Sequence, residues 1–462
     1  MQVRLLGPAT ASEVTDSQAY EWYLKGRAQL AKRDHMQQAV DLFEQVIAID
    51  PDYAPAHASL ALALVWGGDQ QHERSETAAI RALKLDPGNS DALTAMGRIR
   101  VEQWRQKEAR GLLERAIANN PNNALAYRWL GTAYGTADPV RYHEFAWKAY
   151  LTDPLDPTIH FHLAISLSRL GRFDEALSAA WELHPHDYVL AGAIWGFKGQ
   201  LDKALMSYYL AYRETPASSP GAESIPDILL SLNEVELAEA WVQDLKEASS
   251  NSFHVIEARL ARLRGQPEQA VTLFFDSDPN PVARGFAQIL YGSDFEEARK
   301  LFEQGLSKPG QEVPRFKPDI WPAFIHYALA LQRTGAAGRA SELIGEIMAL
   351  IRVQLEAGVV IGPFDIHLEF NMGQLHAMSD HKQEAIAALR RAASQGGLTC
   401  TWCLRLMPHF DSLRDNAAFE ALITGQEAKL ATQRQRLDDE GMLLTPAEVL
   451  QNKNLSFDPF VN

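Results

Sequence analysis

The stretch Tyr127-Arg-Trp-Leu130-Gly131-Thr-Ala-Tyr134 decides the fold. It sets a small residue, Gly131, among large apolar residues at helical spacing. A small residue at that place lets a second helix approach closely, because little side chain separates the two helix axes. The stretch therefore predicts the first helix of a closely packed helix pair.

Small residues recur at the same place in other segments: Gly26, Ala61, Gly97, Gly131, Ala164, Ala258, Ala328 and Gly373. A second pattern is an alanine followed four residues later by a larger apolar residue: Ala39/Phe43, Ala109/Leu113, Ala204/Tyr208, Ala238/Val242, Ala270/Phe274, Ala298/Phe302, Ala340/Ile344 and Ala385/Leu389. Residues four apart lie on one face of a helix, so the large residue fills the gap beside the small one. The two patterns together predict repeated helix–turn–helix units.

Glycines and prolines mark the ends of the predicted helices. Glycine suits the left-handed residue that ends a helix, and one stands five residues before four of these alanines, at Gly171, Gly199, Gly265 and Gly335. Proline cannot continue a helix interior, and prolines spaced 36, 34 and 33 residues apart stand at Pro51, Pro87, Pro121 and Pro154. The repeated unit is therefore about 34 residues long.

This period and the L-G-x2-Y core at Leu130, Gly131 and Tyr134 resemble the tetratricopeptide repeat. Neither helix of such a unit can bury its apolar face alone, so stacked neighbours share one continuous core. We expect an all-α fold, an α-solenoid of about eleven helix–turn–helix units between Ser17 and Gly397 with a C-terminal helical cap.

Composition divides this array into segments. Residues 217–226 and 307–318 are rich in turn-forming residues, so we expect loops there. The predicted segments are a leader at 1–16, a first repeat block at 17–216, a degenerate middle block at 217–318, a last repeat block at 319–397, and a helical cap and tail at 398–462.

The predicted cap contains a dense apolar set that should cover the last repeat: Trp402, Leu404, Leu406, Met407, Phe410, Leu413, Phe419 and Leu422. A polar, solvated helix is expected over 425–440. A further short helix should begin at Thr445, because Thr445, Pro446 and Glu448 form a helix-start pattern.

Both ends of the array resemble a narrower group of repeat regions. Residues 19–27 and 39–56, and then 385–397 and 413–423, are similar to the repeats found downstream of bacterial winged-helix transcriptional activators and class III adenylate or guanylate cyclases. The sixteen residues before Ser17 are too few for a winged helix or a cyclase domain, so neither DNA binding nor cyclic-nucleotide synthesis carries over. The chain is then either a stand-alone relative or a piece of a longer protein.

Composition argues against several other classes of protein. The 462 residues are 46% hydrophobic and 22% charged, as in ordinary globular chains. The formal charge of −15 repels phosphate backbones, so we expect no nucleic-acid partner. The longest apolar stretch, 54–68, is shorter than the roughly 18 residues that span a bilayer, and two cysteines are too few for a disulfide framework. We expect a soluble, cytoplasmic protein.

Few residues suggest catalysis or metal binding. Cys400-Thr-Trp-Cys403 has the spacing of a redox motif, with His376 and His409 as further ligands if a metal bound. A helical cap offers neither a thioredoxin-like strand nor four converging ligands, so we interpret both cysteines as packing residues. Because reaction-specific motifs are absent from the sequence, we expect no enzyme activity, no cofactor and no metal.

In the resembled family, the first helix of each unit lines a concave inner face. The expected partner-binding residues on that face are Tyr23, Arg27, Arg98, Arg128, Phe161, Arg259 and Arg262. The planar donors of arginine suit acidic or carboxylate groups of a partner, and solvated charges on a helix surface are the alternative interpretation. The family's Lys/Asn clamp for a C-terminal carboxylate is absent, because Tyr23 and Arg27 occupy its first positions.

We therefore expect a non-catalytic scaffold for protein–protein interaction, which binds a partner peptide or protein segment in the concave groove. The alternative is a signal-input module that senses a ligand and regulates a DNA-binding or nucleotide cyclase partner. A neighbouring open reading frame that encodes such a partner would favour the alternative.

Overall fold

The protein is helical in the part that the structure describes. The computed structural model describes residues 16–32, 36–66, 71–135, 137–181, 187–216, 221–248, 253–307, 314–362 and 366–457. Apart from one isolated antiparallel bridge between Ile361 and His367, the regular elements in these ranges are helices, which confirms the all-α prediction. None of these helices combines the length and apolar character needed to cross a membrane. Most of the expected leader and the end of the tail lie outside the described ranges.

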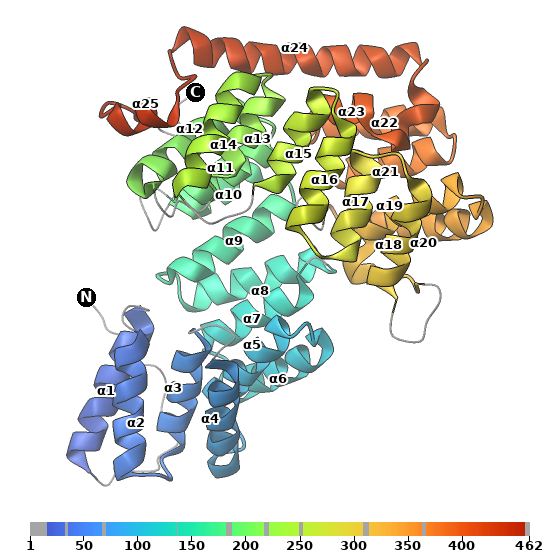
Figure 1. Cartoon of the computed structure of the whole chain (residues 1–462). Helices are drawn as coiled ribbons and strands as arrows, with labels where there is room; N and C mark the ends of the chain where they lie inside the picture. The colour runs from blue at the N-terminus through green and yellow to red at the C-terminus, as the bar shows by residue number, and fades with distance from the viewer. Residues whose placement is uncertain are drawn as a thin grey trace. The chain divides into compact units, whose positions relative to one another are not determined.

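Contacts divide the chain into two compact units, unit 1 at residues 1–166 and unit 2 at residues 167–462. The helices of unit 1 are α1 (Ser17–Lys32), α2 (Met36–Ile49), α3 (Ala54–Val65), α4 (His72–Leu85), α5 (Ser90–Glu102), α6 (Gln106–Asn119), α7 (Ala124–Tyr134) and α8 (Pro139–Thr152) (Figure 1). Helix α9 (Pro157–Arg169) crosses the boundary. The three predicted repeat blocks stay a prediction.

Unit 2 contains the remaining helices. Those of its repeats are α10 (Phe173–Trp181), α11 (Tyr188–Phe197), α12 (Leu201–Glu214), α13 (Ser224–Ser231), α14 (Val235–Ala248), α15 (His254–Leu263), α16 (Pro267–Ser277), α17 (Pro281–Leu290), α18 (Phe295–Leu306), α19 (Trp321–Arg333), α20 (Ala337–Glu356), α21 (Leu368–Met378) and α22 (Lys382–Ser394). Those of its cap are α23 (Thr401–Leu406), α24 (Ala417–Asp439) and α25 (Pro446–Gln451). Two short 3₁₀ helices are η3 (Pro318–Ile320) and η5 (Pro408–Leu413).

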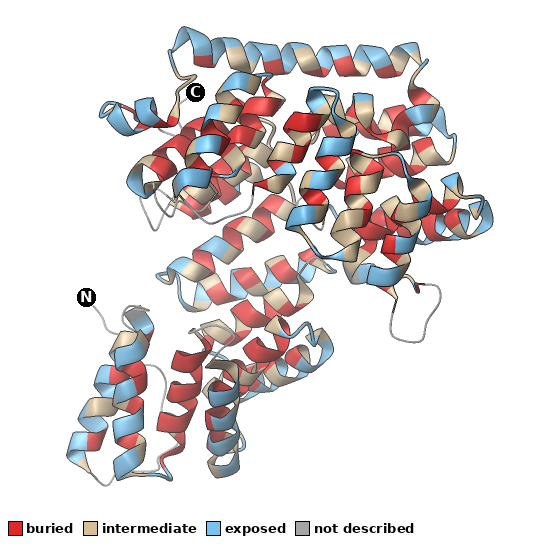
Figure 2. Ribbon diagram, in the orientation of Figure 1, coloured by how far each residue is buried: buried red, intermediate tan, exposed pale blue. Residues whose placement is uncertain are grey.

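Helices α1 to α22 follow one another as eleven pairs, as the sequence predicted. The alanines of the eight Ala/large pairs are all 0% exposed, and their larger partners are at most 9% exposed. Helix α3 is buried along almost its whole length, because it packs on helices of its own pair and of both neighbouring pairs (Figure 2). The small-and-large pattern is therefore the core of each pair.

The close approach of paired helices leaves no room for a side chain at the small positions. A Cβ atom added to Gly97 would lie 2.5 Å from Leu113 Cγ, and one added to Gly373 would lie 2.7 Å from Leu389 Cγ. Both distances are far below van der Waals contact, so glycine is required by packing at these two positions.

The predicted helix ends are confirmed. Left-handed backbone occurs at Gly171 (φ 68°), Gly199 (φ 75°), Gly265 (φ 76°) and Gly335 (φ 82°), each in the turn between two helices of a pair. Helices α2, α4, α6 and α8 each end two residues before one of the four predicted prolines.

Unit 2 closes on itself, because its first segments contact its last ones. The Val360 N–H donates a hydrogen bond to the Arg169 carbonyl at 2.8 Å. The Nε2 atom of His367 lies 3.0 Å from the carbonyl oxygen of Phe197 at the end of α11. These contacts join residues about 170 to 190 positions apart in the sequence.

Helix α24 completes this closure. The predicted polar helix over 425–440 is confirmed, and most of its residues are exposed, but it also contacts an earlier repeat. The helix contacts α22 and α23 near its start and α12 farther along. There, the Gln433 side-chain oxygen accepts a hydrogen bond from the Leu201 N–H at 2.6 Å, and Arg436 Nε donates to Asp202 at 2.8 Å. The polar residues of this helix form specific contacts with an earlier repeat.

The remaining predictions for the cap and loops are partly confirmed. Leu404, Met407, Phe410, Leu413 and Phe419 pack on α22, as expected, whereas Trp402 lies outside that cluster. The capping box of Thr445 and Glu448 is present. The predicted loop at 217–226 is wrong in its second part, because α13 already begins at Ser224, and 217–220 lie outside the described residues.

The packing of Gly97 predicts the outcome of a matched pair of substitutions. Gly97→Ala should lower the free energy of unfolding by about 1–3 kcal/mol, because the new methyl group overlaps Leu113. Gly111→Ala, in the adjacent α6 with no atom within 4 Å of the added Cβ, should raise it by about 0.5–1 kcal/mol through helix propensity. Urea denaturation of both variants measures the two changes, and equal stability would contradict the close approach.

Candidate functional site

The first helices of unit 1 form a continuous face, here called the inner face. Helix α3 contacts α1 and α5, and α5 contacts α7. A polar network crosses this face: Arg27 on α1 donates to Ser59 on α3 at 3.1 Å and to Asp91 on α5 at 2.5 Å. Asn123, the residue before α7, donates to Thr94 on α5 at 3.1 Å. The network ties successive repeats together.

Arg27 is therefore bound within the fold. Burial by itself would lower the pKa of Arg27, but the attraction of the Asp91 carboxylate outweighs it and raises that pKa. The guanidinium stays charged and paired. The structure places Arg27 on the expected face, with its charge directed to a residue of this chain.

Two arginines and two tryptophans form a second feature of the inner face, here called the Arg–Trp cluster: Trp66, Arg98, Arg128 and Trp129. The Arg98 guanidinium carbon lies 4.2 Å from the ring centre of Trp66 and 4.8 Å from that of Trp129. The Arg128 carbon lies 4.2 Å from the ring centre of Trp129 and 5.7 Å from that of Trp66. Such stacking fixes the planes of both guanidinium groups.

For Arg98 and Arg128, the alternative interpretation as solvated surface charges is wrong. Arg98 is 9% exposed and Arg128 is 5% exposed, since their side chains lie against the indole rings. Arg98 Nε donates to Glu102 at 2.9 Å, and Glu102 also lies 2.6 Å from the Nε2 atom of His72. Both arginines therefore contribute to the packing of unit 1.

The aromatic candidates differ in their surroundings. Tyr23 packs within the first repeat, with ring centres 6.1 Å from Phe43 and 5.3 Å from Tyr53, and burial raises the pKa of its hydroxyl. Phe161 on α9 is 43% exposed and remains accessible to a partner. Tyr23 is a packing residue of the core.

Arg259 and Arg262 lie on α15 in unit 2. Arg259 forms an ion pair with Asp227 on α13, and its guanidinium carbon lies 4.9 Å from the ring centre of Trp402. Burial lowers the pKa of Arg259, an effect that Tyr291 opposes. Arg262 is half-buried, and its Nε atom is buried without a hydrogen bond in the described structure.

The cysteines of the cap differ from their expected state, and its histidines lie in packing contacts. Cys400 and Cys403 are joined in a disulfide, so their interpretation as free packing residues is wrong. Within the described ranges, no group of three or more His, Cys, Asp or Glu side chains could hold a metal ion. His409 instead packs on His326, with ring centres 4.7 Å apart.

The histidine pair of His326 and His409 lies inside unit 2, where His409 is 1% exposed and His326 is half-buried. Burial lowers the pKa of His326 to about 3. Burial also holds the pKa of His409 well below its ordinary value, and the positive charges of His326 and Arg333 add to this effect. Neither nitrogen of His409 has a hydrogen-bond partner among the described residues. Both rings are therefore neutral at physiological pH.

Sequence reasoning missed the partners of the inner-face arginines. One signal in the sequence pointed to the polar network of the inner face. Asn89 and Asn123 stand 34 residues apart, which is one repeat length, and the side chain of each caps the helix that follows it. No comparable signal links Trp66 to Trp129, since Trp66 follows the end of α3 and Arg98 reaches it from the next unit.

Comparison with known proteins defines the class of this α-solenoid. Residues 60–124 and 94–134 match the sequence model of the tetratricopeptide repeat. Residues 60–134 of unit 1 are thus similar to the tetratricopeptide repeat, and this segment includes the whole Arg–Trp cluster. A search of curated proteins finds no match. The narrower resemblance to repeats of winged-helix activators and cyclases stays a prediction.

Several solved structures are similar to parts of the chain. PilF of Pseudomonas aeruginosa is 20% identical over 43% of this chain and 93% of its own, with a TM-score of 0.35. TTC0263 of Thermus thermophilus is 20% identical over 38% and 96%, with a TM-score of 0.33. YrrB, described as a tetratricopeptide protein with an unusual peptide-binding site, is 25% identical over 38% and 92%, with a TM-score of 0.29.

Burial of the Arg–Trp cluster predicts the effect of charge reversal. Arg98→Glu should destabilise unit 1 by about 3–5 kcal/mol, because it leaves a buried negative charge beside Glu102. Arg115→Glu, on the exposed face of α6, should change stability by no more than about 0.5 kcal/mol. Hydrogen exchange of α5 and α6 measures both effects. Equal protection in the two variants would show that Arg98 is a surface charge.

The histidine pair predicts acid sensitivity of unit 2. An unfolded histidine takes up a proton below its ordinary value of 6.5, whereas folded His326 does so only near 3, so the folded state loses stability as pH falls through this window. The slope should reach about 1.4 kcal/mol per pH unit for each histidine.

Denaturant unfolding at several pH values, followed by hydrogen exchange in α19, tests this acid sensitivity. His409→Leu should make the pH dependence shallower, since one buried titrating group is removed. His381→Leu is the matched control at an exposed position and should retain the parental slope. An unchanged slope in the His409 variant would contradict the assignment.

Proposed function

We propose that this chain is a non-catalytic scaffold that holds a protein or peptide partner on the inner face of unit 1. An acidic or carboxylate group of the partner binds at the Arg–Trp cluster. The observation that carries this proposal is the stacking of two guanidinium groups on the same two tryptophans, within the segment that matches the tetratricopeptide repeat.

The electrostatics of the cluster favour an incoming anion. Arg98 and Arg128 bring two positive charges to the same two indole rings, and Glu102 pairs with Arg98 at 2.9 Å. A partner carboxylate adds further charge-assisted hydrogen bonds to these guanidinium groups. The tryptophan rings keep both forks in fixed planes, so little side-chain entropy is lost on binding.

The rest of the inner face supports a binding role. The network of Arg27, Ser59, Asp91 and Asn123 holds α1, α3, α5 and α7 in register. A rigid face of this kind loses little conformational freedom when a partner binds. Phe161 is exposed on α9, the helix after α8, and offers an aromatic surface to a partner.

The proposal predicts which substitutions weaken partner capture. The double variant Arg98→Lys/Arg128→Lys keeps both charges but removes the planar forks, so unit 1 should remain folded with some loss of stability from the lost stacking, and the partner should bind at least about tenfold more weakly. Arg115→Lys is the matched control and should bind like the parent. Circular dichroism checks the fold of each variant.

The measurement is quantitative pull-down from the source lysate at low and high salt, with mass spectrometry of the captured proteins. Partners that depend on the cluster should be rich in accessible carboxylates and should be lost at high salt from the parent chain. The proposal that a partner carboxylate binds at the Arg–Trp cluster fails if the double-lysine variant captures every partner that the parent chain captures, with the same salt dependence.

A further inference from the structure

The disulfide of Cys400 and Cys403 lies at the start of the cap. Cys400 directly precedes α23 and Cys403 lies in its first turn, with Cα atoms 5.4 Å apart. Both residues are half-buried, so neither sulfur is sealed inside the core. The bond closes a loop of only two intervening residues, Thr401 and Trp402, and links no distant parts of the chain. A bond of this kind does little for the stability of the fold, because the loop it closes is short.

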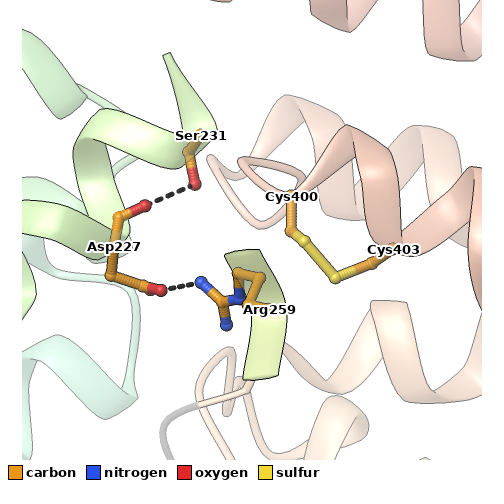
Figure 3. The surroundings of a disulfide bond; sticks show 5 residues. All are labelled: Asp227, Ser231, Arg259, Cys400 and Cys403. Atoms are coloured by element: carbon orange, nitrogen blue, oxygen red, sulfur yellow. Dashed lines mark hydrogen bonds and ion pairs between the residues drawn. A yellow bond between two sulfur atoms is a disulfide. The ribbon is translucent and has the colours of Figure 1, made fainter. Parts of the chain in front are cut away.

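An ion-paired arginine, Arg259, lies beside this loop. The guanidinium carbon of Arg259 on α15 is 4.9 Å from the ring centre of Trp402, the residue directly before Cys403. Figure 3 shows Arg259 turned toward its ion-pair partner Asp227, with the Cys400–Cys403 bond beside it. Arg405, two residues after Cys403, adds a second guanidinium on α23, which pairs with Glu420 and Glu427.

A neighbouring cation changes the chemistry of a cysteine pair. It stabilises the thiolate form, lowers the pKa of the thiol and thereby stabilises the reduced pair relative to the disulfide. Disulfides with a stabilised reduced form are reduced and re-formed readily, unlike bonds that only brace a fold. The position of Arg259 therefore favours reversible redox chemistry at Cys400 and Cys403.

We propose that Cys400 and Cys403 form a redox-active pair that undergoes thiol–disulfide exchange with a thiol reductant, and that Arg259 stabilises the reduced pair. Arg259 is a positioning residue, since it acts on the sulfurs through the loop that holds them. This redox role is independent of partner binding by unit 1.

The exchange is balanced by two thiol molecules. The thiolate of the first attacks one cysteine sulfur and forms a mixed disulfide, while the Cys400–Cys403 bond breaks and the other cysteine leaves as a thiolate. The thiolate of the second reductant molecule then attacks the reductant sulfur of the mixed disulfide and releases the remaining cysteine. Two electrons and two protons pass to the pair, and the two reductant molecules are joined in a disulfide.

Redox titration of the full chain tests the proposal. Purified protein is equilibrated with defined ratios of reduced and oxidised glutathione, and free thiols are trapped with an alkylating reagent and counted by mass spectrometry. Because the chain has only two cysteines, each trapped thiol belongs to this pair. We expect a reversible transition between no trapped thiols and two, within the range that glutathione sets.

Variants of Arg259 separate a redox role from a packing role. Arg259→Gln removes the cation, so the equilibrium constant for reduction by glutathione should fall about tenfold for each unit by which the thiol pKa rises. Arg259→Lys keeps the charge and should remain close to the parent. Arg264→Gln removes an exposed charge near the end of the same helix and serves as the matched control.

The thiol pKa is measured independently, from the pH dependence of the alkylation rate of the reduced protein. If Arg259→Gln fails to fold, the Lys variant and the parent still decide the outcome through the position and reversibility of the transition. A pair that stays oxidised throughout the glutathione range would overturn the proposal. So would an Arg259→Gln variant with the parental midpoint and thiol pKa.

Discussion

The close contact between a small residue on one helix and the side chain of its paired helix supports the rest of this structure. Where Gly97 meets Leu113, or Gly373 meets Leu389, the two helix axes approach so closely that no further carbon fits. That approach sets the spacing of the helices within a pair. The spacing then lets α3, α5 and α7 lie side by side, which brings the inner-face side chains within hydrogen-bonding reach of one another. Local sterics thus determine where the polar groups of unit 1 meet.

The contacts that the sequence predicted are those within about one repeat. The eleven helix pairs, the left-handed glycines and the apolar cap of Phe410 and Phe419 all follow from spacings of four to thirty-four residues. Contacts over longer distances were missed, because periodicity carries no information about them. The buried face of α24 and the surroundings of Arg98 both depend on residues from other repeats. A local pattern therefore placed Arg98 on the inner face without its contacts to Trp66 and Trp129, and α24 without its contacts to α12.

This chain has 44 basic residues against 59 acidic ones, and several of its arginines form contacts within the fold. Arg27 joins three repeats through Ser59 and Asp91, and Arg436 joins the cap to α12 through Asp202. Arginine suits this role because one planar group donates several hydrogen bonds in fixed directions. The Arg–Trp cluster differs from these pairs, since its two cations share aromatic neighbours. The Arg–Trp cluster is therefore the place in unit 1 that we propose for partner binding.

The self-contact of unit 2 also limits how this part of the chain can evolve. Repeat proteins commonly change length by gaining or losing whole repeats, because each repeat contacts only its neighbours. In unit 2, an additional repeat would separate Gln433 from Leu201 and Val360 from Arg169, and would leave their backbone groups without partners. We therefore expect relatives of this chain to keep the same number of repeats between residues 167 and 462. Divergence in this unit has to proceed by substitution at a constant repeat number, as in a toroidal protein rather than an open array.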